Sequence, residues 1–409
     1  MEQIRHAAVL VAVVAVLAFA LRFYDCAYPP APWLDEGGHV AASYSYWNDG
    51  QFGPDNWEHP PLRHILLQGF LQLFGDTPYG WRMRNIIFGS LAAGLATLCA
   101  LQATGSRKAA LMAGLLLATD PLHVVLSRYT WEEIYGGAFF LAAIVCYLKR
   151  TRTVYWQGAS ALFMGCALAT KWYYVPAWFL LCALSLARNG TFKCRRDVLH
   201  VVCVWLLIPV SVYVLSYYPW FGRGYTLGEF VQFVVNAYYS LQGYQLQQYN
   251  PNLLFLTHAS AREWFVAPII VGQGTFVSAD RGEFIIYMNS LPIWGLTLPA
   301  IAVMAVHAAR KKSLALALPA LVFCATYALY FIVKRPAFIY SAAPLLPFAF
   351  IAIAYVIARL SDKFGLKCYV AALALLVGWN LYLYPLVTAK KVPVAAYRSI
   401  LERPEVKVH

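Results

Sequence analysis

The run HAAVLVAVVAVLAFALRF, from His6 to Phe23, decides the class of this fold. A helix that crosses a bilayer needs about 20 consecutive, predominantly apolar residues, and this run approaches that length. A secretory signal peptide would place a small-residue cleavage site after the run, whereas Tyr24, Asp25 and Cys26 follow here. We therefore expect a retained first transmembrane helix.

The composition extends this interpretation to the whole chain. Of the 409 residues, 61% are hydrophobic and 12% are charged, whereas a typical soluble domain is about 25% charged. Apolar runs predict about eleven transmembrane helices, at 7–24, 83–104, 107–125, 131–149, 154–170, 172–187, 197–218, 290–309, 313–333, 337–360 and 367–388. The predicted fold is an all-α polytopic membrane protein, which excludes soluble multidomain folds.

The basic residues predict the orientation of these helices. With the eleven predicted spans, the main Lys and Arg clusters all fall on one side, as the positive-inside bias requires. These clusters are at 107–108, 149–152, 188–196, 310–312 and 359–367. We expect a multi-pass protein of the cell (inner) membrane with a cytoplasmic N-terminus. The long segments 25–82 and 219–289 then face the periplasm or exterior, and we expect the active site there.

The net charge and the cysteines add two exclusions. The net charge is +13, but the basic residues lie in short clusters between apolar runs and form no continuous basic face, so no nucleic-acid partner is expected. Of the nine cysteines, only Cys26 falls clearly outside the membrane on its outer side, so no outer disulfide framework is expected.

Two short helices are predicted in the first outer segment. Residues 35–47 place apolar and polar side chains on opposite faces, and Pro60-Pro61 opens a second amphipathic helix that extends to Phe74. The second helix is too short to span, and its polar stripe is regular. We therefore expect these helices to lie along the membrane surface.

Candidate catalytic carboxylates follow the first helix. Asp35 and Glu36 lie in the motif PWLDEGGH, at the membrane surface, where a carboxylate can be partly desolvated and its pKa tuned. The alternative is an ordinary acidic helix N-terminus, which the helix dipole favours.

Cationic candidates for binding a phosphate lie at or near the outer ends of predicted helices. They are Arg84, Arg128, Lys171 and Arg335. The alternative for each is snorkelling to the lipid headgroups, and Arg128 has a second alternative, pairing with Glu132 or Glu133.

The remaining polar candidates also have structural alternatives. Asp120 can cap a turn with Pro121. His59 and His258 can have structural roles in solvated loops that are rich in aromatic residues. His39, His59 and a carboxylate offer ligands for a divalent metal, but their spacing is irregular, so a required metal is not favoured and no cofactor is expected.

The motifs together resemble a known family. Asp35-Glu36 in the first outer segment, followed by His59-Pro60-Pro61-Leu62, is similar to the protein O-mannosyltransferases, which are GT-C glycosyltransferases. Further matches in chain order are Arg84, Asp120, Ser127-Arg128-Tyr129, Glu133, Thr170-Lys171-Trp172, His258 with Ser260 and Trp264, Asn289 to Trp294, and Arg335 with Phe338-Ile339-Tyr340.

The resemblance implies a GT-C fold and an inverting glycosyl transfer from a polyprenyl-phosphate sugar. It implies that Asp35 is the base that deprotonates the acceptor hydroxyl and that Glu36 orients the acceptor or the sugar. A donor of this kind already has a good leaving group, so cations that hold its phosphate are needed rather than an acid. The donor-site residues implied are Arg84, Arg128, Lys171, Arg335, His59, Glu133, Asp120 and His258.

Departures from the family leave the sugar and acceptor open. Gly37-Gly38 widens the Asp-Glu-x-His spacing, Arg63-His64 replaces Gly-Lys, and Ser341 replaces a late His. We expect the enzyme to transfer mannose or another hexose to a protein Ser or Thr. The alternative is a lipid or glycan acceptor, as for the aminoarabinose transferases. A lipid-linked-sugar transporter is less favoured, because the charges gather at outer ends rather than at the midplane. Residues 1–388 are predicted to form the catalytic domain, and 389–409 a short tail.

Overall fold

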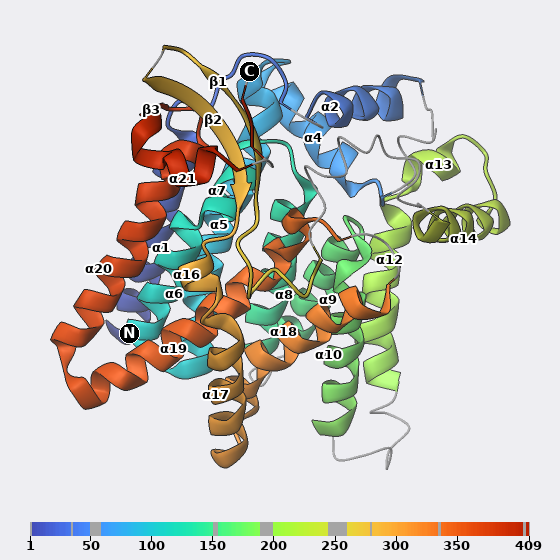
Figure 1. Ribbon diagram of the computed structural model, residues 1–409. Coiled ribbons are helices and arrows are strands. Elements are labelled where there is room, and N and C mark those ends of the chain that lie inside the picture. The colour runs from blue at the N-terminus through green and yellow to red at the C-terminus, as the bar shows by residue number, and fades with distance from the viewer. Residues whose placement is uncertain are drawn as a thin grey trace.

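The computed structural model describes residues 2–33, 36–49, 59–149, 154–188, 199–243, 260–278, 280–333, 337–403 and 406–408. Figure 1 shows a helical bundle with a small sheet and several short helices gathered at one end, and the N-terminus toward the other. One or more described helices overlap each apolar range that the sequence predicts. They are α1 (Glu2–Phe23), α5 (Pro78–Thr104), α6 (Arg107–Thr119), α7 (Pro121–Arg128), α8 (Glu132–Lys149), α9 (Val154–Leu168), α10 (Val175–Arg188), α12 (Ile208–Leu215), α16 (Leu291–Trp294), α17 (Thr297–Arg310), α18 (Leu314–Ile332), α19 (Leu346–Phe364) and α20 (Leu366–Leu383).

Only some of these helices have the length and hydropathy of a membrane span. Within the described ranges, six helical segments are long and apolar enough to cross a membrane, or seven if α6 and α7, which are bent by 56° at Asp120, form one span. α9, α10 and α12 are shorter, and α8 carries Glu132, Glu133 and Lys149. The multi-span character is therefore confirmed, and the number eleven stays a prediction.

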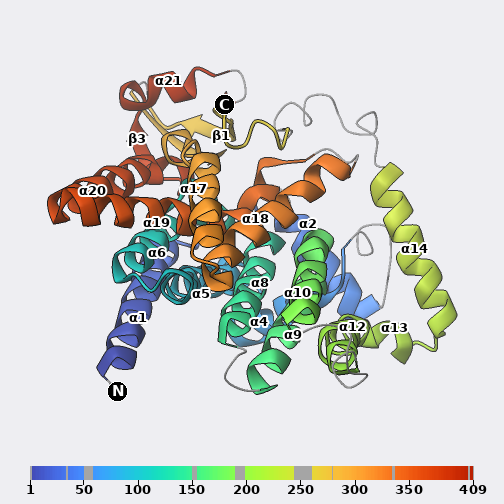
Figure 2. The same cartoon turned by 90° about the horizontal axis from the view of Figure 1, so that it is seen from below.

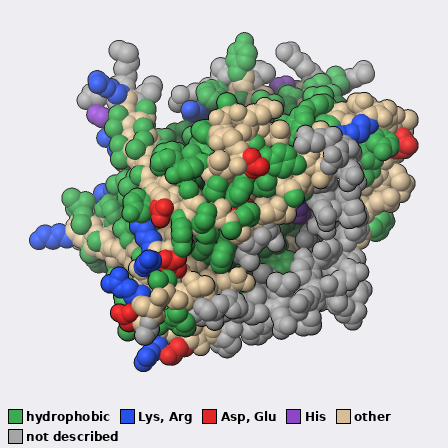
Figure 3. Space-filling view, turned by 90° about the horizontal axis from the view of Figure 1, so that it is seen from above, with side chains coloured by type: hydrophobic (Ala, Val, Ile, Leu, Met, Phe, Trp, Pro, Cys, Tyr) green, Lys and Arg blue, Asp and Glu red, His purple; other side chains and the backbone are tan. Residues whose placement is uncertain are grey.

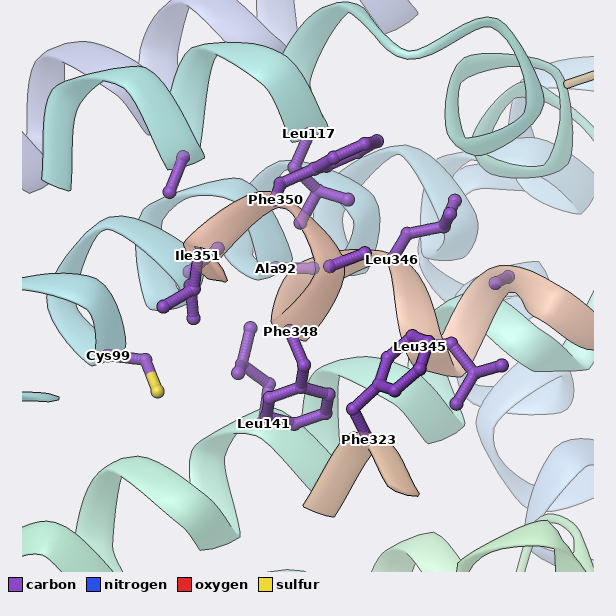
Figure 4. Close-up of a cluster of buried hydrophobic side chains, with 14 of the residues drawn as sticks. Ala92, Cys99, Leu117, Leu141, Phe323, Leu345, Leu346, Phe348, Phe350 and Ile351 are labelled. Carbon is purple, nitrogen blue, oxygen red and sulfur yellow. The ribbon is translucent and has the colours of Figure 1, made fainter. Parts of the chain in front are cut away.

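The centre of the bundle is α19. Every residue from Ser341 to Tyr355 is buried, as expected for a helix that is hydrophobic on all sides. Figure 4 shows Phe348, Phe350 and Ile351 among Leu117, Leu141 and Phe323 from surrounding helices. Small residues allow close packing elsewhere, since a Cβ on Gly114 would lie 1.9 Å from Thr97 Oγ1 of α5.

A four-stranded sheet, which the sequence does not predict, accompanies the predicted helices. Its strands are β1 (Ile270–Phe276), β2 (Arg281–Met288), β3 (Lys391–Pro393) and β4 (Val406–Val408), in the order β3-β2-β1-β4. β1 and β2 form an antiparallel hairpin with Ile270 opposite Met288, and β4 runs parallel to β1. The predicted C-terminal tail therefore supplies both edge strands of a sheet that the sequence analysis missed.

Short helices surround the end of the bundle that carries the sheet. α2 (Glu36–Tyr44) continues as a π-helical turn, η1 (Ser45–Asp49), and α4 (Leu62–Phe74) begins after Pro61. Both agree with the predicted surface helices, and they pack through Val40, Leu67 and Leu71. The segment 219–289, which the sequence predicts to face outward, is represented by α13 (Tyr218–Gly222) and α14 (Leu227–Gly243). Figure 2 shows α14 at the margin of the bundle, and Figure 3 shows hydrophobic side chains over much of the described upper face.

Candidate functional site

A cavity of about 670 Å³ opens beside the helical bundle. α9, α10, α12, α14 and α18 supply most of its walls, through side chains such as Leu168, Trp178, Val210, Tyr238 and Leu329. The lining is largely apolar and aromatic. Its titratable members other than tyrosine are Lys171 and His59, so the described cavity combines a hydrophobic wall with a cationic position.

Lys171 lies in the turn between α9 and the 3₁₀ helix η2 (Trp172–Tyr174). Its side chain is only 5% exposed, and it forms ion pairs with two carboxylates from the first turn of α8. Nζ lies 2.5 Å from Glu133 Oε1 and 3.0 Å from Glu132 Oε2. The rings of Tyr173 and Tyr340 lie 5.3 and 5.6 Å from Nζ. A buried lysine with these partners keeps its charge at the cavity wall.

The second oxygen of Glu132 extends this cluster to the surface helices. Oε1 pairs with Arg63 Nη1 of α4, and it lies 3.6 Å from His39 Nδ1 of α2. Burial lowers the pKa of His39 from 6.5 to about 4, so the ring is neutral at pH 7. Burial followed by the charge of Arg63 also holds the pKa of His64 well below its usual range.

Glu36 is held in a separate buried network. Its carboxylate, on a residue that is 2% exposed, accepts hydrogen bonds from Arg82 Nη2 at 2.8 Å, from Arg82 Nε at 3.1 and 3.2 Å, and from Thr130 Oγ1 at 3.0 Å. The backbone N–H of Trp33 donates to the same group at 3.1 Å. Arg82 also donates to the carbonyl oxygens of Cys26 and Ala31. Glu36 therefore ties the connection after α1 to α5, and these contacts occupy both carboxylate oxygens.

Arg128 has contacts that are typical of a structural residue. Its guanidinium donates to the carbonyl oxygens of Arg22 at 2.9 Å, Tyr24 at 2.6 Å and Asp25 at 3.0 Å. These carbonyls lie at the C-terminal end of α1, where helices leave acceptors unpaired. The residue is 1% exposed and does not line the cavity.

Arg84 and Asp120 are also engaged by protein groups. Arg84 donates to Asn85 Oδ1 at 3.0 Å and to the Arg63 carbonyl at 2.9 Å, and its guanidinium lies 4.3 Å from the ring centre of Tyr135. Asp120 caps α7 by accepting from the His123 N–H, and its other oxygen accepts from Trp294 Nε1 at 2.8 Å. The capping alternative for Asp120 agrees with this geometry.

The structure thus brings together only part of the predicted set. Lys171 and Glu133 form one cluster, and His59 lines the same cavity, whereas Asp35, Arg335 and His258 lie outside the described residues. Sequence reasoning missed Arg63 and Arg82 as ion-pair partners, and it considered Glu132 only as a partner of Arg128. The signals available were the Glu132-Glu133 pair and the departure at Arg63-His64. Within the described ranges, no three His, Cys, Asp or Glu side chains are grouped as metal ligands would be.

Several known proteins are similar to this chain in sequence. The family model described as dolichyl-phosphate-mannose-protein mannosyltransferase matches residues 72–225. The polyprenol-phosphate-mannose–protein mannosyltransferase of Corynebacterium glutamicum is 24% identical over 479 residues, covering 95% of this chain and 92% of the relative. The enzyme of the same name from Mycolicibacterium smegmatis is 25% identical over 257 residues, covering 52% of this chain and 50% of the relative.

Solved structures show the same architecture. The S. cerevisiae protein O-mannosyltransferase Pmt1-Pmt2 complex bound to the sugar donor gives a TM-score of 0.68 at 13% identity, covering 98% of this chain and 93% of the matched chain. The chain therefore shares the fold of this yeast protein, which is the GT-C fold that the sequence predicts. ArnT from Cupriavidus metallidurans bound to undecaprenyl phosphate gives a TM-score of 0.58 at 16% identity, with coverages of 91% and 63%. At these identities the structural likeness concerns the fold.

Proposed function

We propose that this protein transfers a mannosyl or other hexosyl group from a polyprenyl-phosphate carrier to a hydroxyl group of a protein on the outer side of the membrane. The observation that carries the proposal is the largely apolar cavity with the buried Lys171 ammonium in its wall. The apolar side chains can pack against an isoprenoid tail, and the Lys171 ammonium can pair with the phosphate of the carrier. The names of the related mannosyltransferases support mannose as the sugar and protein as the acceptor.

The cavity size fits the head of such a carrier. If each heavy atom takes roughly the ~30 Å³ that a water takes in the liquid, a five-carbon isoprenoid unit needs about 150 Å³. The 670 Å³ cavity then holds roughly four units. The rest of a longer tail leaves toward the lipid. Trp178 and Val210 line the apolar part, while Lys171 and His59 supply the polar positions.

The chemistry needs one base and one stabilised leaving group. Asp35, directly before the anchored Glu36, takes the proton of the acceptor hydroxyl. The hydroxyl oxygen attacks the anomeric carbon as the bond from that carbon to the phosphate oxygen breaks, and the electron pair leaves with the polyprenyl phosphate. Lys171 stabilises the charge that develops on the phosphate. A single in-line displacement inverts the anomeric centre.

The predicted orientation places this reaction outside the cell membrane. The basic clusters Arg310-Lys311-Lys312 and Arg359-Lys363-Lys367 support a cytoplasmic position for those helix ends. A cysteine introduced at Thr275 in β1 is expected to react with an impermeant thiol reagent in intact cells. Reaction only after lysis would contradict the orientation.

The test is transfer by the purified full chain in lipid nanodiscs. Synthetic polyprenyl-phosphate mannose labelled in the sugar is supplied with a Ser/Thr-rich peptide, and in a parallel reaction with a lipid extract. We expect the label on the peptide, with inverted configuration. Label on lipid alone would favour the aminoarabinose-transferase-like alternative. Failure to release sugar from any polyprenyl-phosphate hexose, with the chain folded, would contradict the proposal.

A further inference from the structure

We infer that Glu132 is a positioning residue that couples the surface helices α2 and α4 to the cation at the cavity. The inference rests on the proposed function, because it concerns where the acceptor side of the reaction sits relative to the donor phosphate. Glu132 begins α8 and is 3% exposed. It lies between Lys171, which lines the cavity, and the helix pair that follows Asp35 in the chain.

The two oxygens of Glu132 face different elements. Oε2 contacts Lys171 Nζ at 3.0 Å, in the turn after α9. Oε1 pairs with Arg63 Nη1 in the first turn of α4 and lies 3.6 Å from His39 Nδ1 in α2. One carboxylate therefore holds two cations that come from segments more than 100 residues apart in the chain. A change in the position of either cation must disturb the other.

A chain of hydrogen bonds, each with a defined donor, links Arg63 to α2. Arg63 Nε donates to His64 Nε2 at 3.0 Å, which requires the proton of the neutral imidazole to be on Nδ1. Nδ1 then donates to Ser43 Oγ at 2.9 Å, and the Ser43 hydroxyl donates to the His39 carbonyl at 2.9 Å. His64 also stacks on Tyr46 at 5.0 Å between ring centres. The position of α2 therefore depends on the Arg63 contact with Glu132.

Glu133 provides a matched comparison at the neighbouring position. It is equally buried and contacts the same ammonium, at 2.5 Å. None of its described hydrogen bonds or ion pairs reaches α2 or α4. If the carboxylates acted only by balancing the charge of Lys171, the two residues would be equivalent. Coupling to Arg63 is what separates them.

A double-mutant cycle on the full chain in nanodiscs tests the inference, with polyprenyl-phosphate mannose and a Ser/Thr-rich peptide as substrates. Glu132→Gln should lower kcat by roughly tenfold or more, and Arg63→Gln should lower it similarly, because each breaks the same link. The fold-loss of kcat in the double variant should be at most about twice the fold-loss in the slower single variant. The donor KM should change by less than about threefold in Glu132→Gln, because Lys171 keeps Glu133 as its partner.

The neighbouring carboxylate provides the control cycle. The effects of Glu133→Gln and Arg63→Gln should come much closer to multiplying than those of Glu132→Gln and Arg63→Gln, because Glu133 reaches Arg63 only through Lys171 and Glu132. Multiplicative effects for Glu132 with Arg63 would overturn the inference. So would a donor KM that rises as much as kcat falls in Glu132→Gln, because Glu132 would then act through carrier binding.

Hydrogen–deuterium exchange separates this inference from the proposed function. Glu132→Gln should speed exchange in α2 and α4 relative to both wild type and Glu133→Gln. If the wild-type chain transfers no sugar but this difference appears, the proposed function fails and the coupling stands. Equal exchange in the two glutamine variants would overturn the coupling whatever the activity.

Discussion

Replacing Glu36 with glutamine should release the connection between α1 and α2 from the helical bundle. In the native protein the Glu36 carboxylate is the charge partner of Arg82, whose side chain is 0% exposed. Arg82 in turn donates to the Cys26 carbonyl at 2.9 Å and the Ala31 carbonyl at 3.3 Å. Glutamine keeps the shape but removes the charge, so a buried guanidinium loses its compensating partner.

The magnitude follows from the burial of this pair. Removing one partner of a buried ion pair typically costs about 3–5 kcal/mol. With a tenfold change for every ~1.4 kcal/mol, opening of this connection should become roughly 10²- to 4 × 10³-fold more frequent. Thr130→Val removes only a neutral donor to the same carboxylate, which costs about 1 kcal/mol and should raise opening by about fivefold.

Cys26 supplies a native reporter for this opening. The residue is 1% exposed, and burial raises the pKa of its thiol, so the closed state should react slowly with an impermeant maleimide. Labelling is followed by mass spectrometry of the peptide that contains Cys26, since other cysteines are present. We expect the labelling rate to order as wild type, then Thr130→Val, then Glu36→Gln.

A double variant distinguishes an unpaired charge from a damaged fold. Glu36→Leu with Arg82→Met removes both charges, and replacing a whole buried ion pair by apolar residues is often nearly neutral. Its labelling rate should lie closer to wild type than that of Glu36→Gln. A rate for Glu36→Gln within about twofold of wild type, or a double variant worse than the single, would refute the anchoring role.

Three further outcomes are expected. Asp35→Asn should lower kcat by roughly 10²- to 10⁴-fold with the donor KM nearly unchanged, and near-normal turnover would remove Asp35 as the base. Lys171→Met should raise the donor KM by about 10- to 100-fold through loss of a charged contact to phosphate, whereas the same change at Lys391, which is 59% exposed, should have little effect. The pKa of His39 falls from 6.5 in the unfolded chain to about 4 in the folded one. Protons therefore bind the unfolded state preferentially between these values, and stability should fall by up to about 3 kcal/mol as the pH drops through that window. His39→Gln should flatten this loss in a thermal-unfolding series from pH 7 to 4.

The helices could be predicted from sequence because their signals are local. Apolar runs located each long helix, and Pro61 marked the start of α4. The sheet had no comparable signal. β1 and β2 contain Gly272, Gly274 and Gly282, and glycines inside a strand weaken the sequence pattern by which a strand is predicted. The edge strands β3 and β4 come from a tail more than 100 residues later in the chain, so their pairing depends on tertiary contacts.

The site was predictable to the extent that single residues reveal a role. Lys171 and Glu133 were identified, and they meet in the fold. The functions of Glu36 and Arg128 depend on partners that sequence spacing does not show, because Glu36 pairs 46 residues away and Arg128 caps a helix more than 100 residues earlier. A basic residue at an outer helix end is equally compatible with a phosphate site and with a carbonyl cluster.

Photo-crosslinking of the carrier tests most directly whether the cavity holds the donor. A polyprenyl phosphate with a diazirine in one of its first isoprenoid units is bound to the full chain in nanodiscs, irradiated and mapped by mass spectrometry of the labelled peptides. Label should appear on the cavity wall, at Trp172 to Trp178, Val234 to Tyr239 and Leu329 to Val333, and excess unlabelled polyprenyl phosphate should reduce it. Label confined to the separate groove between α17 and α18, lined by Ala305, Ala309 and Leu321, or label insensitive to competition, would contradict the assignment of the cavity to the carrier.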